Sequence, residues 1–320
     1  MAAASHPCAE LRTMVRGKVR VNEPLSQHTT LKIGGPADCM VLPASLDDLV
    51  RVVRWCHERG VACTALGLGS NVLAPDEGLR GVVVRTKPGL DYLRFMGAEV
   101  IVGAGASVAR LVAQAANRGL AGVEGLAGVP GSVGGALVMN AGTRTGQIGT
   151  VVRWIRALDA TGTLHTLPVE QLEFAYRSSR LQRERRWLVV EAGLRLTPDD
   201  PQAIRQRVDE ALAYRNRTQP LQLPNAGSIF KNPPGDSAGR LIEAAGCKGW
   251  RRGDAQVSEK HANWIVNLGQ ATADDVFELM LAVRARVLEQ TGIALEREIR
   301  LLGGLCRRWA AALGGPASPA

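Results

Sequence analysis

The sequence has few of the residues that metal sites and base-stacking surfaces require. Its 6 cysteines and 5 histidines are dispersed, with no Cys-x-x-Cys pair and no Cys/His set at zinc spacing, so we expect no metal site. Aromatic residues make up only 4% of the chain. This scarcity argues against a nucleic-acid partner, because single strands are bound on aromatic side chains. We expect the cysteines to be mostly reduced and structural, as in a cytoplasmic protein.

Long apolar runs are also missing. No run approaches the roughly 20 residues of a membrane-spanning helix, so we expect no membrane association. Residues 1–10 lack the basic region and apolar core of a secretory signal, and we therefore expect a cytoplasmic location. The chain has 320 residues, 46% of them hydrophobic and 22% charged, which is typical of a globular protein. Its length predicts roughly two domains.

The net charge of +9 is compatible with nucleic acid, a membrane surface or anionic small molecules as partners. Lysines and arginines are scattered, without a long basic run, and the densest group lies between Arg177 and Arg186. A solvated basic face accounts for most of this group. For one of its members we favour contact with an anionic substrate.

The most distinctive segment is residues 125–142, which is rich in both glycine and apolar residues. A flexible linker would be polar, so this segment is predicted to be buried with its backbone close to another group. Glycine permits positive φ and removes the Cβ that keeps a ligand away. Successive backbone N–H groups in such a loop can bind an anion. A tight buried turn is the alternative interpretation.

Two further glycine-containing turns follow predicted strands. Residues 67–71, Gly-Leu-Gly-Ser-Asn, lack the Gly-Lys-Ser/Thr of a P-loop, yet their amides could contact a pyrophosphate. Residues 103–107 are similar to the start of a dinucleotide-binding fingerprint. The third glycine of that fingerprint is replaced by Val108, so a plain strand-to-helix turn is the better interpretation.

Periodicity, capping residues and glycine stops predict mixed helices and strands, an α+β fold class. The predicted helices span residues 45–60, 108–118, 202–217, 237–245 and 272–292. The predicted strands include residues 61–66, 72–73, 81–85, 99–102, 151–158, 164–166, 187–196, 263–268 and 295–302. The predicted divisions are an N-terminal segment 1–29, a first domain 30–197, a second domain 198–303, and a frayed tail 304–320.

Several segments together resemble the UDP-N-acetylenolpyruvoylglucosamine reductase family. They include Gly-Leu-Gly-Ser-Asn at 67–71, Val-Pro-Gly-Ser-Val-Gly-Gly at 129–135, Tyr-Arg-Ser-Ser-Arg at 176–180, and Ala-Gly-Ser-Ile-Phe-Lys-Asn-Pro at 226–233. Residues 31–37, 140–142, 257–262 and 295–300 complete the set. Each segment alone is weak evidence, but all occur in the family's order and cover about residues 30 to 303.

The resemblance implies an FAD-binding fold of the vanillyl-alcohol-oxidase (PCMH) type in two subdomains, followed by a C-terminal α+β substrate-binding domain. It implies noncovalent FAD, NADPH as reductant, and a sugar-nucleotide substrate. The enzyme would reduce UDP-N-acetylglucosamine-enolpyruvate to UDP-N-acetylmuramate, a peptidoglycan precursor. For the oligomeric state we favour a monomer. The implied FAD contacts are Gly67, Gly69, Ser70, Asn71, Pro130, Gly131, Ser132, Gly134, Gly135, Asn140 and Gly142.

The resemblance also implies three catalytic residues. Arg177 would stabilise the charge that hydride addition pushes onto the substrate carboxylate, since guanidinium presents a planar fork of donors. Ser228 would donate the proton to the α-carbon, and Glu298 would polarise the reacting group. The alternatives are a surface ion pair for Arg177, a turn hydroxyl for Ser228 and an exposed strand carboxylate for Glu298. Glu296 is a rival on the same strand face.

The implied substrate contacts are Tyr176, Lys231 and Asn232. The chain departs from the family at residues 143–147, where Thr-Arg-Thr-Gly-Gln replaces the usual Ala-Tyr-Gly-Gly-Glu, so local contacts near the flavin are not carried over. No tyrosine follows Ser228, as in family members without a tyrosine-bearing substrate loop. Two competing functions are an oxidase of the same flavoprotein fold and a non-catalytic sugar-nucleotide binding protein.

Overall fold

The computed structural model describes residues 7–314, which form two compact units. Unit 1 comprises the chain up to Asn22, Asp38–Leu68 and Gly81–Arg215, and unit 2 comprises Glu23–Ala37, Gly69–Arg80 and the chain from Asn216. Each unit has its own hydrophobic core. The chain therefore passes between the units several times before it completes either.

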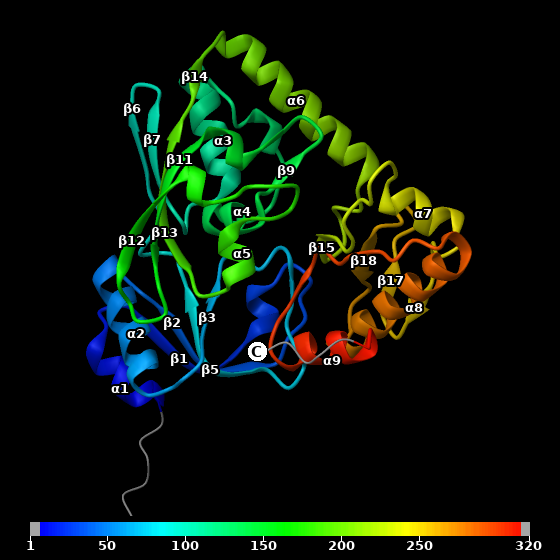
Figure 1. Ribbon diagram of the computed structural model, residues 1–320, viewed down its shortest axis with the longest axis horizontal. Coiled ribbons are helices and arrows are strands. Elements are labelled where there is room, and N and C mark those ends of the chain that lie inside the picture. The colour runs from blue at the N-terminus through cyan, green and yellow to red at the C-terminus, as the bar shows by residue number, and fades with distance from the viewer. Residues whose placement is uncertain (1–6, 315–320) are drawn as a thin grey trace, which may run out of the picture. The chain divides into compact units, whose positions relative to one another are not determined.

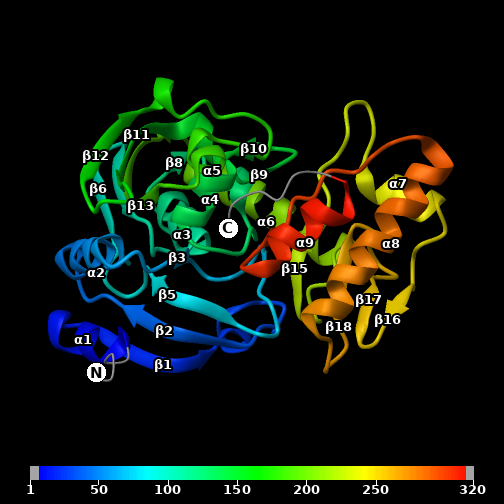
Figure 2. The same cartoon turned by 60° about the horizontal axis from the view of Figure 1, so that its bottom comes forward.

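The first sheet of unit 1 has the strand order β1-β2-β5-β3 (Figures 1 and 2). The bounds are β1 Lys18–Pro24, β2 Pro36–Leu42, β3 Cys63–Leu66 and β5 Leu79–Arg85. Two helices, α1 (Pro7–Met14) and α2 (Leu46–Glu58), share a core with these strands. The predicted helix 45–60 is confirmed, and its N-cap is Ser45, whose Oγ accepts from the Asp48 amide.

The second sheet of unit 1 is antiparallel, with the order β12-β11-β13-β7-β6. The bounds are β6 Leu93–Met96, β7 Glu99–Gly103, β11 Val152–Leu158, β12 Leu164–Pro168 and β13 Leu188–Arg195. Helix α4 (Val133–Met139) contacts β7 and β13, and it lies near α3 (Val108–Asn117) (Figure 1). The smaller elements are β8 Leu120–Ala121, β9 Gly142–Thr143, β10 Gly146–Gln147, β14 Thr197–Pro198 and α5 Arg180–Glu184.

Unit 2 is built on an antiparallel sheet with the order β15-β18-β17-β16. The bounds are β15 Asn225–Ser228, β16 Arg251–Arg252, β17 Ala255–Val257 and β18 Trp264–Asn267. Helices α7 (Ala238–Ala244) and α8 (Ala273–Thr291) contact one another (Figure 2). A separate parallel pair joins β4 (Val72–Leu73) to β19 (Arg300–Leu301). The boundary between the two units, at Arg215 and Asn216, falls within helix α6 (Pro201–Thr218).

The predicted helix beginning at Thr272 is confirmed in detail. Thr272 and Asp275 form a reciprocal capping box, and Gly292 ends the helix in the left-handed conformation. The predicted helices 108–118, 202–217 and 237–245 are also confirmed, as α3, α6 and α7. All of these helices carry local start or stop signals that act within a few residues.

Two predictions near the C-terminus were wrong. The expected frayed tail contains helix α9 (Gly304–Ala312), because Leu305 and Trp309 lie one turn apart and are buried, with Trp309 edge-on to Phe277 at 5.9 Å between ring centroids. The expected strand 295–302 is limited to β19. Successive amides of a strand cannot share one acceptor, yet Glu298 and Ile299 both donate to the Ile229 carbonyl.

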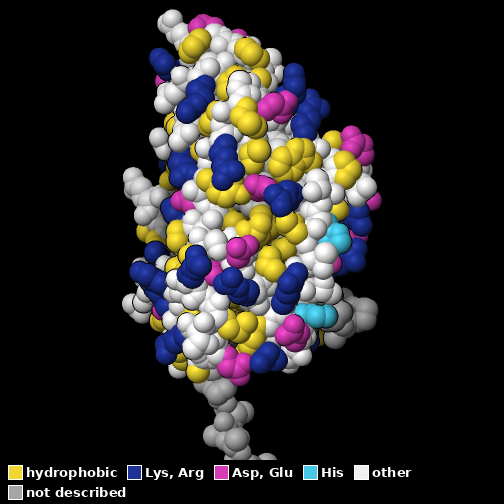
Figure 3. Space-filling view, turned by 90° about the vertical axis from the view of Figure 1, so that its left-hand side faces the viewer, with side chains coloured by type: hydrophobic (Ala, Val, Ile, Leu, Met, Phe, Trp, Pro, Cys, Tyr) yellow, Lys and Arg dark blue, Asp and Glu magenta, His cyan; other side chains and the backbone are white. Residues whose placement is uncertain are grey.

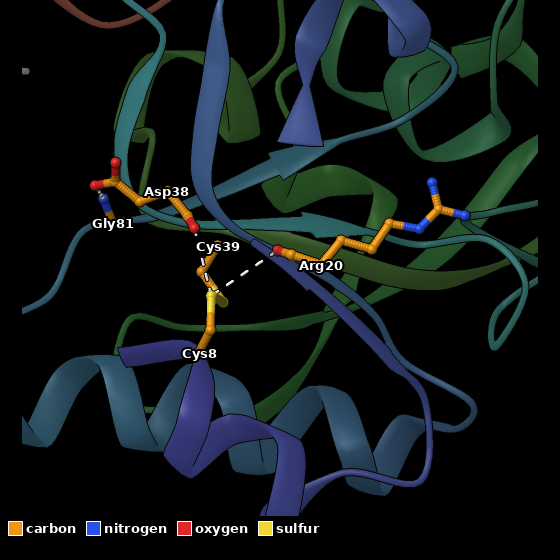
Figure 4. The surroundings of a disulfide bond; sticks show 5 residues. All are labelled: Cys8, Arg20, Asp38, Cys39 and Gly81. Atoms are coloured by element: carbon orange, nitrogen blue, oxygen red, sulfur yellow. Dashed lines mark hydrogen bonds between the residues drawn. A yellow bond between two sulfur atoms is a disulfide. The ribbon is translucent and has the colours of Figure 1, made fainter. Parts of the chain in front are cut away.

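The cysteines are only partly as expected. Cys56, Cys63, Cys247 and Cys306 are free thiols, but Cys8 and Cys39 form a disulfide (Figure 4). The bond joins α1 to β2 within unit 1. A separation of 31 residues carries no local signal in the sequence, and the fold alone places the two side chains together.

Candidate functional site

The glycine-rich segment 125–142 contains a turn that enters helix α4. Ser132 is the N-cap, and its Oγ accepts from the Gly135 amide at 3.3 Å. This turn lies against the turn between β7 and α3: Ser107 and Ser132 form an antiparallel bridge, and the Gly134 amide donates to the Ala104 carbonyl at 2.9 Å. The two glycine-containing turns that the sequence analysis treated separately are therefore packed together in unit 1.

The same region shows why side chains are excluded at two of its glycines. A Cβ on Gly134 would lie 2.8 Å from the Ala104 Cβ, and a Cβ on Gly67 would lie 2.3 Å from the Ser132 Oγ. Both distances are shorter than real Cβ contacts allow. The start of the 67–71 segment is thus adjacent to the 129–135 segment, as expected if both contact one ligand.

Gly135 differs from these glycines because the space at its Cβ position is open. The nearest atom to an added Cβ would be the Ser132 Oγ at 3.6 Å, and Gly135 is exposed although its neighbours Gly134 and Ala136 are buried. An exposed backbone without a side chain is the surface that a closely approaching cofactor requires. The exposed backbone of Gly135 therefore fits such a group. The amide of Gly134, however, is already used inside the protein.

Asn140 connects this region to neighbouring loops. It ends α4 in the left-handed conformation, at a φ of 45°, and is fully buried. Its Oδ1 accepts from the Gly149 amide at 3.0 Å, and its Nδ2 donates to the Ala175 carbonyl at 2.9 Å and the Gln147 Oε1 at 3.1 Å. Gln147, one of the residues that departs from the family pattern, therefore helps to hold Asn140.

Arg177 is held beside the same segment. The turn that carries it is closed by a bridge between Ala175 and Ser178, and Arg177 has a φ of 50°. Its Nη2 donates to the Gly142 carbonyl at 2.6 Å, and its guanidinium carbon lies 5.2 Å from the centroid of the Tyr176 ring, which is half-exposed. Unit 1 thus brings together Arg177, Tyr176 and the predicted cofactor contacts Asn140 and Gly142.

Unit 2 holds residues 69–71 of the 67–71 segment. Gly69 has a φ of 68°, and a Cβ there would lie 2.1 Å from the His28 carbonyl oxygen. Asn71 donates from its Nδ2 to the Glu298 carbonyl at 3.2 Å, and its own carbonyl accepts from the Arg300 amide at 3.0 Å. Asn71 therefore fixes the backbone of Glu298. The sequence analysis predicted only a cofactor contact for it.

Ser228 and Glu298 are brought together through Ile229 in unit 2. β15 pairs with β18 at Asn225 and at Ser228, with one extra residue on β15, and Gly227 in this bulge has a φ of 75°. The Glu298 amide donates to the Ile229 carbonyl at 2.7 Å. Ser228 directly precedes Ile229 in the chain, and Glu298 is hydrogen-bonded to Ile229. The two predicted catalytic residues are therefore both adjacent to Ile229, although 70 positions separate them in the numbering.

The structure distinguishes Glu298 from its rival Glu296. The Glu296 side chain is 72% exposed and forms an ion pair with Lys231, with 2.6 Å between Nζ and Oε1. Pairs with such an exposed partner contribute about 0–1 kcal/mol, so Lys231 can exchange this partner for a ligand anion. Asn232 accepts from the Ala238 amide at 3.0 Å through Oδ1, at the start of α7.

Sequence reasoning missed Asn263, a buried residue beside the Ser228 segment. Its Oδ1 accepts from the Phe230 amide at 2.9 Å, and its Nδ2 donates to the Phe230 carbonyl at 2.8 Å. Its own amide donates to the Nδ1 of His261 at 3.2 Å. Burial lowers the pKa of His261, so the neutral ring is favoured. Asn263 directly follows segment 257–262, but nothing in its spacing identifies its partner.

Metal-ligand chemistry gives no candidate among the described residues. Figure 3 shows one face on which Lys and Arg alternate with acidic and apolar side chains. Within residues 7–314, no group of three or more His, Cys, Asp and Glu residues could hold a metal ion. No helix in that range has both the length and the apolar character needed to cross a membrane.

Two family models match the chain. The model described as FAD binding domain matches residues 37–168, and the model described as UDP-N-acetylenolpyruvoylglucosamine reductase, C-terminal domain, matches residues 219–302. The first match contains the segment 129–135, and the second contains Ser228 and Glu298. The predicted fold class, an FAD-binding fold followed by a C-terminal α+β domain, is confirmed.

Whole-chain relatives agree with the two models. The UDP-N-acetylenolpyruvoylglucosamine reductase of Heliobacterium modesticaldum is 47% identical over 90% of this chain and 92% of its own, and that of Bacillus subtilis is 44% identical over 92% and 97%. The crystal structure of the Thermus caldophilus enzyme of this name is similar, with a TM-score of 0.75 and 38% identity, covering 90% of this chain and 99% of its own. The chain therefore belongs to the UDP-N-acetylenolpyruvoylglucosamine reductase family, a family of oxidoreductases.

Proposed function

We propose that this protein reduces the enolpyruvyl group of UDP-N-acetylglucosamine-enolpyruvate to the lactyl ether of UDP-N-acetylmuramate, with NADPH as the reductant. The names of the relatives support the substrate, and the FAD-binding model supports a flavin cofactor. The observation that carries the proposal is the joint placement of Ser228 and Glu298 on either side of the Ile229 peptide. These are the two residues that the proton-transfer half of the reaction needs.

A bound FAD would be held by the glycine-containing turns at Gly67 and at 129–135, and it would supply the hydride chemistry that links NADPH to the β-carbon of the substrate double bond. Charge then develops on the substrate carboxylate, where Arg177 provides a planar, permanently charged fork. In the structure that guanidinium is oriented by the Gly142 carbonyl and the Tyr176 ring.

The α-carbon must receive a proton, and we assign this step to the Ser228 hydroxyl. A serine hydroxyl is a weak acid, so it needs a neighbour that stabilises the transfer. We assign that role to Glu298, whose backbone is fixed by Ile229 on one side and Asn71 on the other. Hydride at the β-carbon and proton at the α-carbon together convert the double bond to a single bond while NADPH is oxidised.

Substrate binding away from the reacting bond is assigned to Tyr176, Lys231 and Asn232. Lys231 suits a diphosphate, because its present partner Glu296 is highly exposed and weakly held. Tyr176 is half-exposed beside Arg177, so its ring is available to a ligand. Asn232 would combine a structural bond to α7 with a polar contact to the nucleotide.

The experiment uses the purified full chain loaded with flavin. We expect a yellow protein that absorbs near ~450 nm. It should oxidise NADPH only when the enolpyruvyl substrate is present. The product should be about two mass units heavier than the substrate, because one hydride and one proton are added. Steady oxygen consumption in place of substrate reduction would indicate an oxidase. A colourless protein that binds the sugar nucleotide without turnover would indicate a binding protein. Either result would contradict the proposal.

A further inference from the structure

The segment from Ser228 to Lys231 leaves its parent sheet after the β15 bulge. The last pair of the β15–β18 ladder joins Ser228 to Trp264, so the next residues on this side have no strand opposite them. Phe230 is nevertheless buried, with 1% of its surface exposed. Buried backbone N–H and C=O groups need partners, since each one left unpaired costs free energy. The Phe230 peptide groups must therefore be satisfied in another way.

The Asn263 side chain supplies both partners. Its Oδ1 accepts a hydrogen bond from the Phe230 amide at 2.9 Å, and its Nδ2 donates to the Phe230 carbonyl at 2.8 Å. Asn263 itself is 3% exposed. A carboxamide carries the same donor and acceptor as a peptide group, and only one orientation of the amide satisfies both bonds. The Asn263 carbonyl also accepts from the Ile229 amide at 2.9 Å. One residue thus continues the ladder that β18 has ended.

The opposite edge of the same segment pairs with residues 296–299. The Ile229 carbonyl accepts from the Glu298 amide, the Lys231 amide donates to the Glu296 carbonyl at 2.8 Å, and Phe230 forms a bridge with Arg297. The segment is therefore a narrow strip between Asn263 and residues 296–299. A shift of the strip away from Asn263 would move Ser228 relative to Glu298.

We propose that Asn263 is a positioning residue, whose side-chain amide holds the Ser228–Lys231 strip so that Ser228 and Glu298 face the substrate at their working separation. This inference rests on the proposed function, because it takes the catalytic roles of these two residues from it. Asn263 itself touches no reacting atom. Its effect is confined to the proton-transfer half of the reaction, and hydride transfer from NADPH to the flavin does not depend on it.

A matched control, Asn267, lies at the far end of β18, the strand that begins directly after Asn263. Asn267 is also buried, at 2% exposure, and its side chain donates to the Leu31 carbonyl at 3.1 Å and accepts from the Gly269 and Ala271 amides at 2.8 and 3.1 Å. Its side chain makes three hydrogen bonds, against two for the Asn263 side chain, and none of them reaches the Ser228–Lys231 strip. Asn267→Ala therefore measures what the loss of a buried asparagine does to the fold alone.

The test compares Asn263→Ala, Asn263→Asp and Asn267→Ala with the wild-type holoenzyme in stopped-flow experiments. For Asn263→Ala we expect reoxidation by the enolpyruvyl substrate to slow about 10²-fold, the cost of a small misplacement of catalytic groups, while reduction by NADPH changes less than about twofold. Asn263→Asp keeps the acceptor for the Phe230 amide and should lie between. Asn267→Ala should lower the melting temperature without separating the two half-reactions.

A second readout does not depend on turnover. Hydrogen exchange of peptides covering residues 228–231 should become faster in Asn263→Ala and remain unchanged in Asn267→Ala. A wild-type rate of reoxidation in Asn263→Ala, equal slowing of both half-reactions, or the same split in Asn267→Ala would overturn the proposal. If Asn263→Ala does not fold, Asn263→Asp decides in the same way. Failure of the wild-type protein to reduce the substrate would contradict the proposed function, and the exchange data would still show whether Asn263 holds the strip.

Discussion

The turns around the start of helix α4 in unit 1 are shaped by residues that lack a side chain, whereas the Ser228–Glu298 region of unit 2 is held by side-chain amides. At Gly67 and Gly134 an added Cβ would lie 2.3 Å from the Ser132 Oγ and 2.8 Å from the Ala104 Cβ, so the neighbouring atoms would have to shift. In unit 2 the critical contacts are made by Asn263 and Asn71, whose carboxamides bond to the backbone of Phe230 and Glu298. The turns around α4 are limited by excluded volume, and the Ser228–Glu298 region is held by directed hydrogen bonds.

The difference has a consequence for how each region responds to substitution. At a glycine without room for a side chain, even one added methyl group overlaps neighbouring atoms. Substitutions at such positions of unit 1 should therefore have an abrupt effect, seen as altered packing or altered cofactor binding. Hydrogen bonds can be removed one at a time, so the response in unit 2 should be graded and should appear in the reaction rate. Three predictions test this contrast, from the largest expected effect to the smallest.

Ser228→Ala should have the largest effect, and only on one half of the reaction. General acid catalysis typically contributes ~10²–10⁴-fold, and we expect reoxidation of the reduced enzyme by the enolpyruvyl substrate to slow by that factor. Flavin content, reduction by NADPH and substrate affinity should change little, because the hydroxyl acts in the transition state. Stopped-flow measurement of both half-reactions decides the matter.

Ser237→Ala is the matched control for this prediction. Its hydroxyl caps α7 by accepting from the Arg240 amide at 3.2 Å, so its loss should cost about 1 kcal/mol of stability without slowing reoxidation. Equal slowing of both half-reactions in Ser228→Ala, or none at all, would show that Ser228 is a structural turn hydroxyl.

The adjacent glycines of α4 should respond in opposite directions when each is replaced by alanine. Gly134→Ala should destabilise the flavin-free protein by about 1–3 kcal/mol, because its Cβ would overlap Ala104. Gly135→Ala should stabilise it by about 0.5–1 kcal/mol, since the space is open and alanine favours a helix. Gly135→Ala should still lose affinity for FAD, because its methyl group would occupy the exposed backbone face.

Urea unfolding of the flavin-free variants and titration with FAD measure these two properties separately. If Gly135→Ala retained wild-type affinity for FAD, the exposed face of Gly135 would not be a cofactor contact. If it destabilised the flavin-free protein, the contrast between the two glycines would be wrong.

The smallest expected effect is a pH dependence in unit 2. Burial, together with Lys248, lowers the pKa of His261 below its ordinary value of 6.5, while Glu243 opposes the shift. The folded state therefore favours the neutral ring, so the stabilisation is fully present above pH 6.5 and is lost as the pH falls through the folded-state pKa. We expect wild-type stability to fall more steeply than that of His261→Gln between about pH 7 and pH 5. Identical slopes in chemical denaturation would refute this.

Local signals predicted much of the fold. Helix α8 is specified by Thr272, Asp275 and Gly292, which lie at its two ends, and α2 is specified in a similar way by Ser45. The glycine-rich segments could be recognised because an excluded Cβ leaves a direct record in the sequence. The helix α9 was predictable in principle from the spacing of Leu305 and Trp309, but it was interpreted as a frayed tail.

Contacts between distant residues were not predictable. Asn263 and Phe230 are 33 residues apart, and the pairing between Cys8 and Cys39 spans 31. The interleaving of the two units follows from strand pairing across the chain, which composition does not record. The strand expected at 295–302 illustrates the same limit, because its hydrogen bonds are decided by the segment that follows the β15 bulge and not by its own alternation.

The parallel pair between β4 and β19 also constrains how the protein can be made. Val72 is paired with Arg300, so the earlier strand leaves the ribosome long before its partner is synthesised. At typical translation rates this interval is roughly 10–45 s. Throughout it, the Gly69–Leu73 region has no β19 to pair with, and unit 2 cannot close. The β4 edge therefore stays unpaired during this interval, and an unpaired strand edge is open to pairing with other chains.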